Sequence, residues 1–188
     1  MGIVEDRIRE SIAVKESILQ NPELISLIHE AGTAVKNAFS SDGKVFTCGN
    51  GGSASDSIHI AAELSGRFQK ERHSLPAISL NADIAALTAI SNDYSFEDVY
   101  ARLLSGIVHE SDVVIGISTS GNSENVYRAL LEAKKRGAKT IGLLGKNGGK
   151  IKDIVDIGII VPCENTARIQ ESHIMIGHII CEIAEEDF

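Results

Sequence analysis

The chain has 188 residues, 43% of them hydrophobic and 23% charged, which is an ordinary composition for a globular protein with a sizeable core. Its formal net charge of -8 argues against a general binder of nucleic acid or anionic membranes, because such partners select basic surfaces. No stretch approaches the ~20 apolar residues of a membrane span, and the acidic N-terminus is unlike a secretory signal. We therefore expect a cytoplasmic protein with one domain over residues 1–188.

The cysteines indicate a reducing compartment. Cys48, Cys163 and Cys181 are odd in number and lack CxxC spacing, which argues against a disulfide framework and a cysteine-based zinc site. We expect all three to be reduced and buried.

Two helices are predicted before the first strand. Apolar residues recur at roughly helical spacing from Ile3 to Leu19, and Asn21-Pro22 then provides an N-cap followed by proline at the first helical position. The second helix is predicted over about 22–40, with apolar residues on one face, and Ser41-Asp42-Gly43 ends it.

Strands and helices alternate through the rest of the chain. Five runs rich in Val, Ile and Leu predict buried parallel strands at Lys44–Cys48, Ala77–Leu80, Val113–Ile117, Thr140–Leu144 and Ile157–Val161. Helical patterns cover Ser53–Ser65, Asp83–Ser91, Phe96–His109, Ser123–Arg136 and Thr166–Glu185. This order predicts an α/β fold, a doubly wound three-layer sandwich around a five-stranded parallel sheet.

Two loops of small polar residues each follow a predicted strand and open a predicted helix. The first loop is Gly49–Ser55 and the second loop is Ser118–Ser123. Glycine lets the backbone approach an anion, hydroxyls donate hydrogen bonds, and a helix N-terminus supplies free N–H groups. Both loops lie beyond the carboxyl ends of strands, so they can converge on one phosphate ester. The residues expected to hold it are Asn50, Gly51, Gly52, Ser53, Ser118, Thr119, Ser120 and Ser123.

Other interpretations of such glycine-rich segments fit less well. The first loop matches a relaxed dinucleotide fingerprint, but the acidic residue expected about 20 residues further on is missing. Gly142–Lys150 fails as a P-loop because Ile151 stands where a serine or threonine belongs. The second loop could be an ordinary helix N-cap with turn residues, although capping explains one hydroxyl and not four.

Acid, base and metal-ligand candidates lie on two predicted helices. His59 and Glu63 are four residues apart and therefore neighbours on one face, and the last helix carries Gln170 and His178. Two histidines with one glutamate form a catalytic zinc set that leaves a coordination position open. The alternatives are a solvated His–Glu pair and a satisfied core histidine. Gln170 and His178 are separated by a rise of ~12 Å on a straight helix, so both reach one ion only if the helix start is bent or frayed or another subunit completes the site.

Three motifs resemble the sugar isomerase (SIS) superfamily, and within it the phosphoheptose isomerases. They are Gly-Asn-Gly-Gly-Ser at 49–53, Gly-Ile-Ser-Thr-Ser-Gly-Asn-Ser at 116–123 and Ala-Arg-Ile-Gln-Glu-Ser-His at 167–173. The similarity covers nearly the whole chain, and the motifs fall in the family's order and spacing. The resemblance implies a flavodoxin-like SIS fold, with residues 1–40 available for contacts in a homotetramer that assembles its sites between subunits.

The resemblance also implies roles for particular residues. The positions matching His59, Glu63, Gln170 and His178 bind zinc in this family, one Zn2+ per subunit, and those matching Glu63 and His178 act as acid/base groups. Glu63 and Gln170 are expected to contact substrate as well. Asn92 and Asp93 match positions that contact the sugar hydroxyls, although by themselves they could be a turn and the N-cap of the helix after Ser95. Some members carry an acidic residue where this chain has Ala167.

The function implied is isomerisation of sedoheptulose 7-phosphate to a glycero-manno-heptose 7-phosphate, toward nucleotide-activated heptose for lipopolysaccharide or capsule. One alternative is a non-catalytic SIS module, either a sugar-phosphate sensor or a partner of a replication initiator. Relatives of that kind lose the residues matching Glu63 and His178, and this chain has kept both. The other alternative is an SIS isomerase for a different sugar phosphate, since phosphate loops do not measure sugar length.

Overall fold

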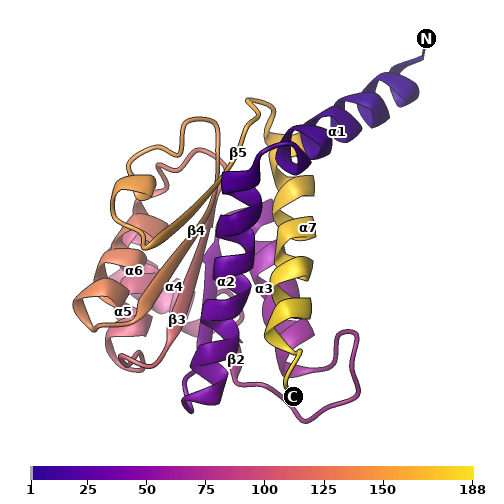
Figure 1. Cartoon of the computed structure of the whole chain (residues 1–188). Helices are drawn as coiled ribbons and strands as arrows, with labels where there is room; N and C mark the ends of the chain where they lie inside the picture. The colour runs from indigo at the N-terminus through magenta and orange to yellow at the C-terminus, as the bar shows by residue number, and fades with distance from the viewer. Residues whose placement is uncertain (1) are drawn as a thin grey trace.

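A five-stranded parallel sheet forms the centre of the structure, a computed structural model that describes residues 2–188 (Figure 1). The strand order is β2-β1-β3-β4-β5, which confirms the predicted doubly wound sheet. Its strands are β1 (Val45–Gly49), β2 (Ala77–Ser79), β3 (Val113–Ser118), β4 (Lys139–Gly145) and β5 (Ile157–Val161). The strand order reverses between β1 and β3, and the crevice at the carboxyl ends of such strands is where open α/β sheets bind ligands.

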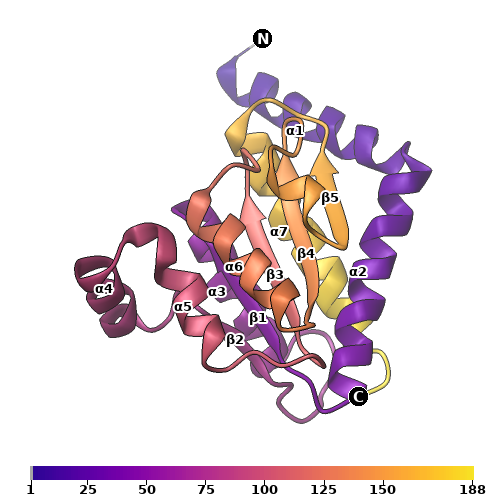
Figure 2. The same cartoon turned by 90° about the vertical axis from the view of Figure 1, so that its left-hand side faces the viewer.

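Helices cover both faces of the sheet. They are α1 (Ile3–Leu19), α2 (Pro22–Ser40), α3 (Gly52–Ser65), α4 (Ile84–Asp93), α5 (Val99–Ser105), α6 (Glu124–Lys135) and α7 (Thr166–Ala184). Short 3-10 turns span Phe96–Asp98 and Ile151–Asp153. Figure 1 shows α2, α3 and α7 on one face, whereas α5 and α6 lie on the other, with α4 extending outward from them in Figure 2.

The alternation of side chains along each strand builds a separate core on each face of the sheet. Val113, Ile115 and Ile117 of β3 pack into the core beneath α2, α3 and α7, while Val114 packs toward α5 and α6. All four are almost completely buried, and each such side chain contributes ~1.5–3 kcal/mol relative to an exposed one. The rigid sheet produced in this way fixes the positions of the loops at its edge.

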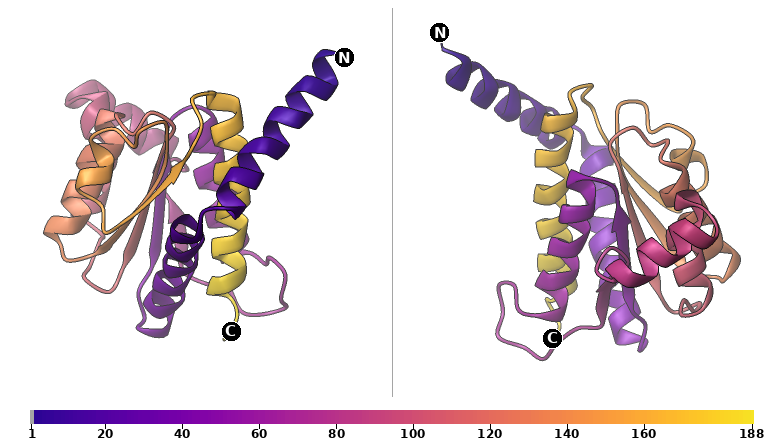
Figure 3. Two further views of the ribbon diagram at one scale, coloured as in Figure 1. Left: turned by 45° about the horizontal axis from the view of Figure 1, so that its top comes forward. Right: turned by 180° about the vertical axis from the view of Figure 1, so that it is seen from behind.

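The two N-terminal helices differ in how they are held. The side chain of Asn21 caps α2 by accepting a hydrogen bond from the Leu24 N–H, and Pro22 follows as predicted. Helix α2 packs along α7, but α1 projects beyond the body in both views of Figure 3. It leaves Ile8, Ile12 and other apolar residues exposed. Among residues 2–188, no helix combines the length and apolarity needed to cross a bilayer.

Several predicted details were wrong. The helix predicted over Phe96–His109 is a 3-10 turn followed by α5, which ends at Ser105 with Gly106 as its C-cap residue. Strand β2 is an edge strand whose Ile78 is 45% exposed and not buried. The three cysteines are free, but Cys163 is only partly buried because it follows the end of β5.

Candidate active site

The first and second loops lie side by side at the carboxyl edge of the sheet. They follow β1 and β3, which pair directly and bring Gly49 opposite Ile117. The N-cap residues of α3 and α6, Gly51 and Ser123, make no side-chain cap hydrogen bond, whereas side chains cap α2, α4 and α7. The two helix N-termini at this edge therefore keep the partial positive charge that attracts an anion.

Glycine permits a left-handed backbone conformation in both loops. Gly51 has φ 58° and Gly121 has φ 66°, the left-handed region that side chains with a Cβ rarely adopt. A Cβ on Gly121 would also lie 2.0 Å from the Gly148 carbonyl oxygen. The segment after β4 thus packs directly against the backbone of the second loop.

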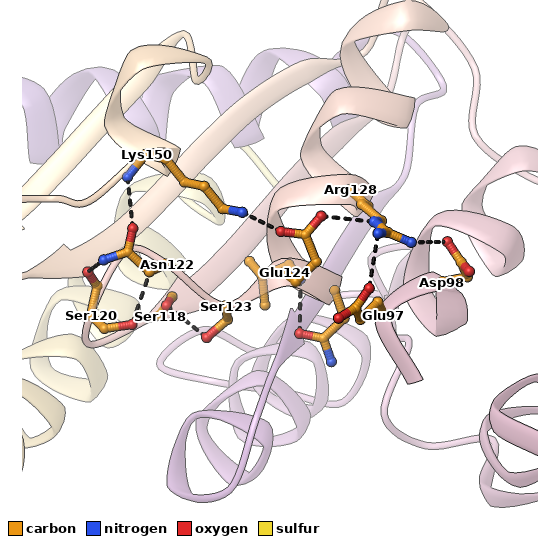
Figure 4. Close-up of polar contacts among 11 residues, drawn as sticks. Glu97, Asp98, Ser118, Ser120, Asn122, Ser123, Glu124, Arg128 and Lys150 are labelled. Carbon is orange, nitrogen blue, oxygen red and sulfur yellow. Dashed lines mark hydrogen bonds and ion pairs between the residues drawn. The ribbon is translucent and has the colours of Figure 1, made fainter. Parts of the chain in front are cut away.

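The hydroxyls of the second loop are partly committed to one another (Figure 4). The Ser118 and Ser123 Oγ atoms lie 3.0 Å apart, and the Asn122 N–H donates to the Ser120 Oγ. The Asn122 Oδ1 in turn accepts the backbone N–H of Lys150. The Ser123 hydroxyl makes no helix-cap hydrogen bond, whereas Ser120 and Asn122 make the contacts of a turn.

A carboxylate at the start of α6 is neutralised by two cations (Figure 4). Glu124 pairs with Lys150 and accepts from the Arg128 Nε at 2.8 Å, and Arg128 also pairs with Asp98 and Glu97. Hydrogen bonds from Lys150, then Arg128, hold the pKa of Glu124 below its usual range. Two cations therefore face three carboxylates here, which reduces the negative charge next to the second loop and its repulsion of a phosphate.

The side chain of Asn50 is hydrogen-bonded to a distant residue that the sequence did not indicate. Its amide forms a reciprocal pair with the amide of Asn125, both hydrogen bonds being 2.8 Å long. The Tyr100 hydroxyl donates to the Gly49 carbonyl at 2.6 Å and lies 3.3 Å from the Asn50 Oδ1. Asn125 is 2% exposed and belongs to α6, so this pair joins the first loop to the helix that follows the second.

Gln170 also lies at the first loop. A Cβ on Gly52 would come within 2.5 Å of the Gln170 Nε2, so the side chain occupies the space that glycine leaves. Helix α7 runs without interruption from Thr166, which places His178 ~12 Å further along its axis. Neither the bent nor the frayed helix start is observed, and within one chain Gln170 lies apart from His178.

His59, Glu63 and His178 form a group that we call the His–Glu cluster. One nitrogen or oxygen of each lies within 4.8 Å of the others, and the His59 Nε2 is 2.9 Å from the Glu63 Oε1. The rings of His59 and His178 meet edge to face at 5.0 Å. Helix α3 supplies the first two residues and α7 the third, so the i, i+4 pair is joined by a partner from a helix far along the chain.

Comparison with known proteins gives the family. The SIS domain family matches residues 10–145. A phosphoheptose isomerase from a Nitratiruptor species is 60% identical over 88% of this chain and 89% of the relative. The chain belongs to the phosphoheptose isomerase family. The enzyme of Clostridium acetobutylicum is 48% identical over 99% of this chain and 95% of its own. The structure of phosphoheptose isomerase from Neisseria gonorrhoeae superposes with a TM-score of 0.91 at 39% identity, covering 97% and 96% of the two chains.

The His–Glu cluster of this phosphoheptose isomerase family member fits a metal ion chemically. The His178 Nε2 is buried and, within residues 2–188, has no hydrogen-bond partner. Such an unpartnered nitrogen is destabilising unless another group, such as a bound cation, satisfies it. Two imidazoles and a carboxylate are also a common donor set of catalytic metal sites. The unpartnered nitrogen and the donor set of the cluster both fit a bound cation.

Three further polar residues lie near or outside the site. Asp56 lies one turn before His59 on α3, and burial raises the pKa of its carboxyl while His59 lowers it. Asn92 and Asp93 are the last residues of α4 and not a turn or an N-cap. Both are at least partly exposed, and the Asn92 Nδ2 donates to the Asp93 Oδ1 at 2.9 Å. No contact in the described chain brings them to the two loops.

Proposed function

We propose that this chain is an aldose/ketose isomerase that converts D-sedoheptulose 7-phosphate to D-glycero-D-manno-heptose 7-phosphate through an enediol. The observation that carries the proposal is the His–Glu cluster, which supplies two imidazoles and a carboxylate on a chain whose two loops are proposed to bind a phosphate. Membership of the phosphoheptose isomerase family supports the same reaction. The product would enter the synthesis of nucleotide-activated heptose.

The two loops would hold the inert end of the substrate. Ser118, Thr119, Ser120 and Ser123 would donate to the phosphate, together with the backbone of Gly51 and Gly52 and the side chains of Asn50 and Ser53. Binding the phosphate restricts the reacting carbons to a small volume and replaces a bimolecular encounter with an oriented one. Asn92 and Asp93 are proposed to contact sugar hydroxyls.

Glu63 and His178 are the proposed acid/base pair. One of them removes a proton from carbon 1, while the other protonates the carbonyl oxygen on carbon 2, which gives the enediol. Collapse of the enediol returns a proton to carbon 2 and removes one from the oxygen on carbon 1. The sequence of transfers leaves the substrate's atoms and charge balanced, because each group ends in its starting protonation state.

We also propose one Zn2+ per subunit at the His–Glu cluster. His59, Glu63 and His178 would hold it, and bound zinc acts as a Lewis acid that polarises a carbonyl. Gln170 is proposed as a further ligand and substrate contact. Its position at the first loop means that its amide would reach a cluster only through the packing of a neighbouring copy.

A homotetramer with contacts from residues 1–40 is proposed for that reason. The exposed apolar residues of α1, which include Ile8, Ile12 and Leu19, support it because such a surface is stabilised by burial against another subunit. An apolar groove between α1, α2 and α7 extends the same surface. The unpaired cysteines support the further proposal of a cytoplasmic location, where thiols stay reduced.

Incubation of the purified protein with sedoheptulose 7-phosphate tests the function. The assay follows formation of an aldoheptose phosphate with the protein as purified, after chelation, and after zinc is restored. We expect conversion that chelation stops and zinc restores. Failure to convert with zinc present would favour a non-catalytic SIS module, whereas conversion of a hexulose or pentulose phosphate alone would assign a different substrate.

A further inference from the structure

A buried ion pair joins the C-terminal ends of α3 and α7, the two helices that carry the His–Glu cluster. The Arg72 Nε lies 2.9 Å from the Glu185 Oε2, and the two side chains are 0% and 1% exposed. Removing two charges from water is costly, so a pair of this kind persists where further hydrogen bonds satisfy both groups. The contacts of both partners therefore indicate what the pair holds in place.

Arg72 closes the C-terminal end of α3. Its Nη2 donates to the Glu63 carbonyl at 3.0 Å, and its Nη1 donates to the Leu64 carbonyl at 2.9 Å and more weakly to that of Gly66. The last carbonyls of a helix lack partners within the helix, and a cation there also interacts favourably with the helix dipole. The guanidinium thus holds the backbone of the very residue that supplies the cluster's carboxylate.

Glu185 binds the backbone of the loop between α3 and β2. It is the C-cap residue of α7, and its Oε1 accepts the backbone N–H groups of Gln69 and Lys70 at 2.8 and 3.1 Å. Figure 3 shows this loop passing the C-terminal end of α7. One carboxylate therefore binds both the loop backbone and Arg72, which ties the loop to the ends of both helices.

The anchored loop presents Phe68 to the cluster. The Phe68 ring stacks on the His178 ring with centroids 5.4 Å apart and an interplanar angle of 23°. The His59 ring contacts the same imidazole edge to face, so His178 is confined between two rings. Phe68 directly precedes Gln69, whose N–H is held by Glu185, so the position of the aromatic ring depends on the ion pair.

We propose that Arg72, Glu185 and Phe68 are positioning residues, which together set the orientation of Glu63 and His178 in the His–Glu cluster. The proposal rests on the proposed function, in which those two groups hold metal and move protons. None of the three positioning residues needs to touch the substrate. Their effect should fall on turnover and metal affinity, because the first and second loops, at the starts of α3 and α6, make none of these contacts.

Two variants and one control test the proposal on the full-length protein. Phe68→Ala removes the stacked ring from a partly buried loop position and leaves the ion pair intact. Arg72→Lys keeps the charge opposite Glu185 but replaces the planar fork with a single ammonium group. Glu71→Ala is the matched control, since that side chain lies in the same loop and is 91% exposed. For each protein we would measure kcat, KM, the zinc dissociation constant by calorimetry, and Tm.

We expect Phe68→Ala to lower kcat and weaken zinc binding by about 10-fold to 100-fold, the usual effect of losing a group that orients a metal ligand, with KM unchanged and Tm slightly lowered because the ring also packs against the core. Arg72→Lys should do the same with a lower Tm, and the double variant should lose no more activity than the worse single variant. Losses confined to Tm in both variants, or losses that multiply in the double variant, would overturn the proposal. If the unmodified protein binds zinc but does not isomerise the heptulose, the proposed function fails, and zinc affinity still tests the positioning role.

Discussion

The loop edge of the sheet and the face formed by α3 and α7 hold their functional groups in different ways. At the loop edge, strand register places the first and second loops side by side. On the α3–α7 face, the cluster is made by side chains from two helices that pack side by side. These side chains are partly open to solvent, since those of His59 and Glu63 are 49% and 23% exposed.

The difference shows how each region obtains its precision. Strand register fixes where the two loops begin, and hydrogen bonds such as those of the Asn50–Asn125 pair then hold the loop edge to neighbouring elements. The His–Glu cluster is not built on paired strands, and the orientation of its side chains depends on the Arg72–Glu185 pair and the Phe68 ring. Changes on the α3–α7 face should therefore affect chemistry, whereas changes at the loop edge should affect binding and stability.

The largest expected effect is on the α3–α7 face. Glu63→Gln and His178→Gln should each lower kcat by ~10²–10⁴-fold, because each removes a group that moves a proton in the proposed reaction. Both substitutions are nearly isosteric at partly exposed positions, so Tm should stay close to that of the unmodified protein. Steady-state kinetics with sedoheptulose 7-phosphate and thermal unfolding give the two measurements.

Glu182→Gln is the matched control for this pair. It is an exposed carboxylate on the last turn of α7, outside the cluster, and should keep full activity. Near-full turnover by either Glu63→Gln or His178→Gln would show that the acid/base assignment is wrong. An equal loss in all three variants would mean that surface charge, and not the cluster, controls the rate.

The same contrast explains what could be predicted from the sequence. The strands, the two loops and the His59–Glu63 pair follow local periodicity and turn chemistry, so they were found where predicted. The partnership of Asn50 with Asn125 depends on how two distant segments pack. Phe68 and Arg72 lie in a loop-like stretch without periodicity, so no local signal marked them. Their importance comes from contacts with the distant C-terminal helix α7 and its cap.

A second histidine of α7 connects stability to pH at the loop edge. His173 is buried, its Nε2 lies 2.9 Å from the Leu144 carbonyl, and burial lowers its pKa from 6.5 to about 4. Below pH 6.5, His173 binds a proton in the unfolded chain but stays neutral in the native state. The free energy of unfolding therefore decreases as the pH falls toward 4. The loss should reach about 3 kcal/mol, at ~1.4 kcal/mol per pH unit of that window. Urea unfolding at about pH 7 and about pH 4 measures it.

His173→Gln should flatten this acid limb, because an amide can occupy the site without titrating. The variant's free energy of unfolding should change less than that of the unmodified protein between the neutral and the acidic measurement. His109→Gln, at an exposed position after α5, serves as the control and should leave the slope unchanged. An undiminished acid loss in His173→Gln would assign the effect to carboxylates instead.

The smallest expected effect tests the amide pair that joins the first loop to α6. Asn125→Ala leaves the Asn50 amide without its partner, which should lower the free energy of unfolding by ~1–3 kcal/mol. KM for the sugar phosphate should rise because the loops lose their mutual register, while kcat stays unchanged because the His–Glu cluster is untouched. In the double variant Asn50→Ala/Asn125→Ala no amide remains unpaired, so stability should recover relative to the single variant while KM stays high. A fall in kcat at unchanged KM would contradict the separation of binding at the loop edge from chemistry on the α3–α7 face.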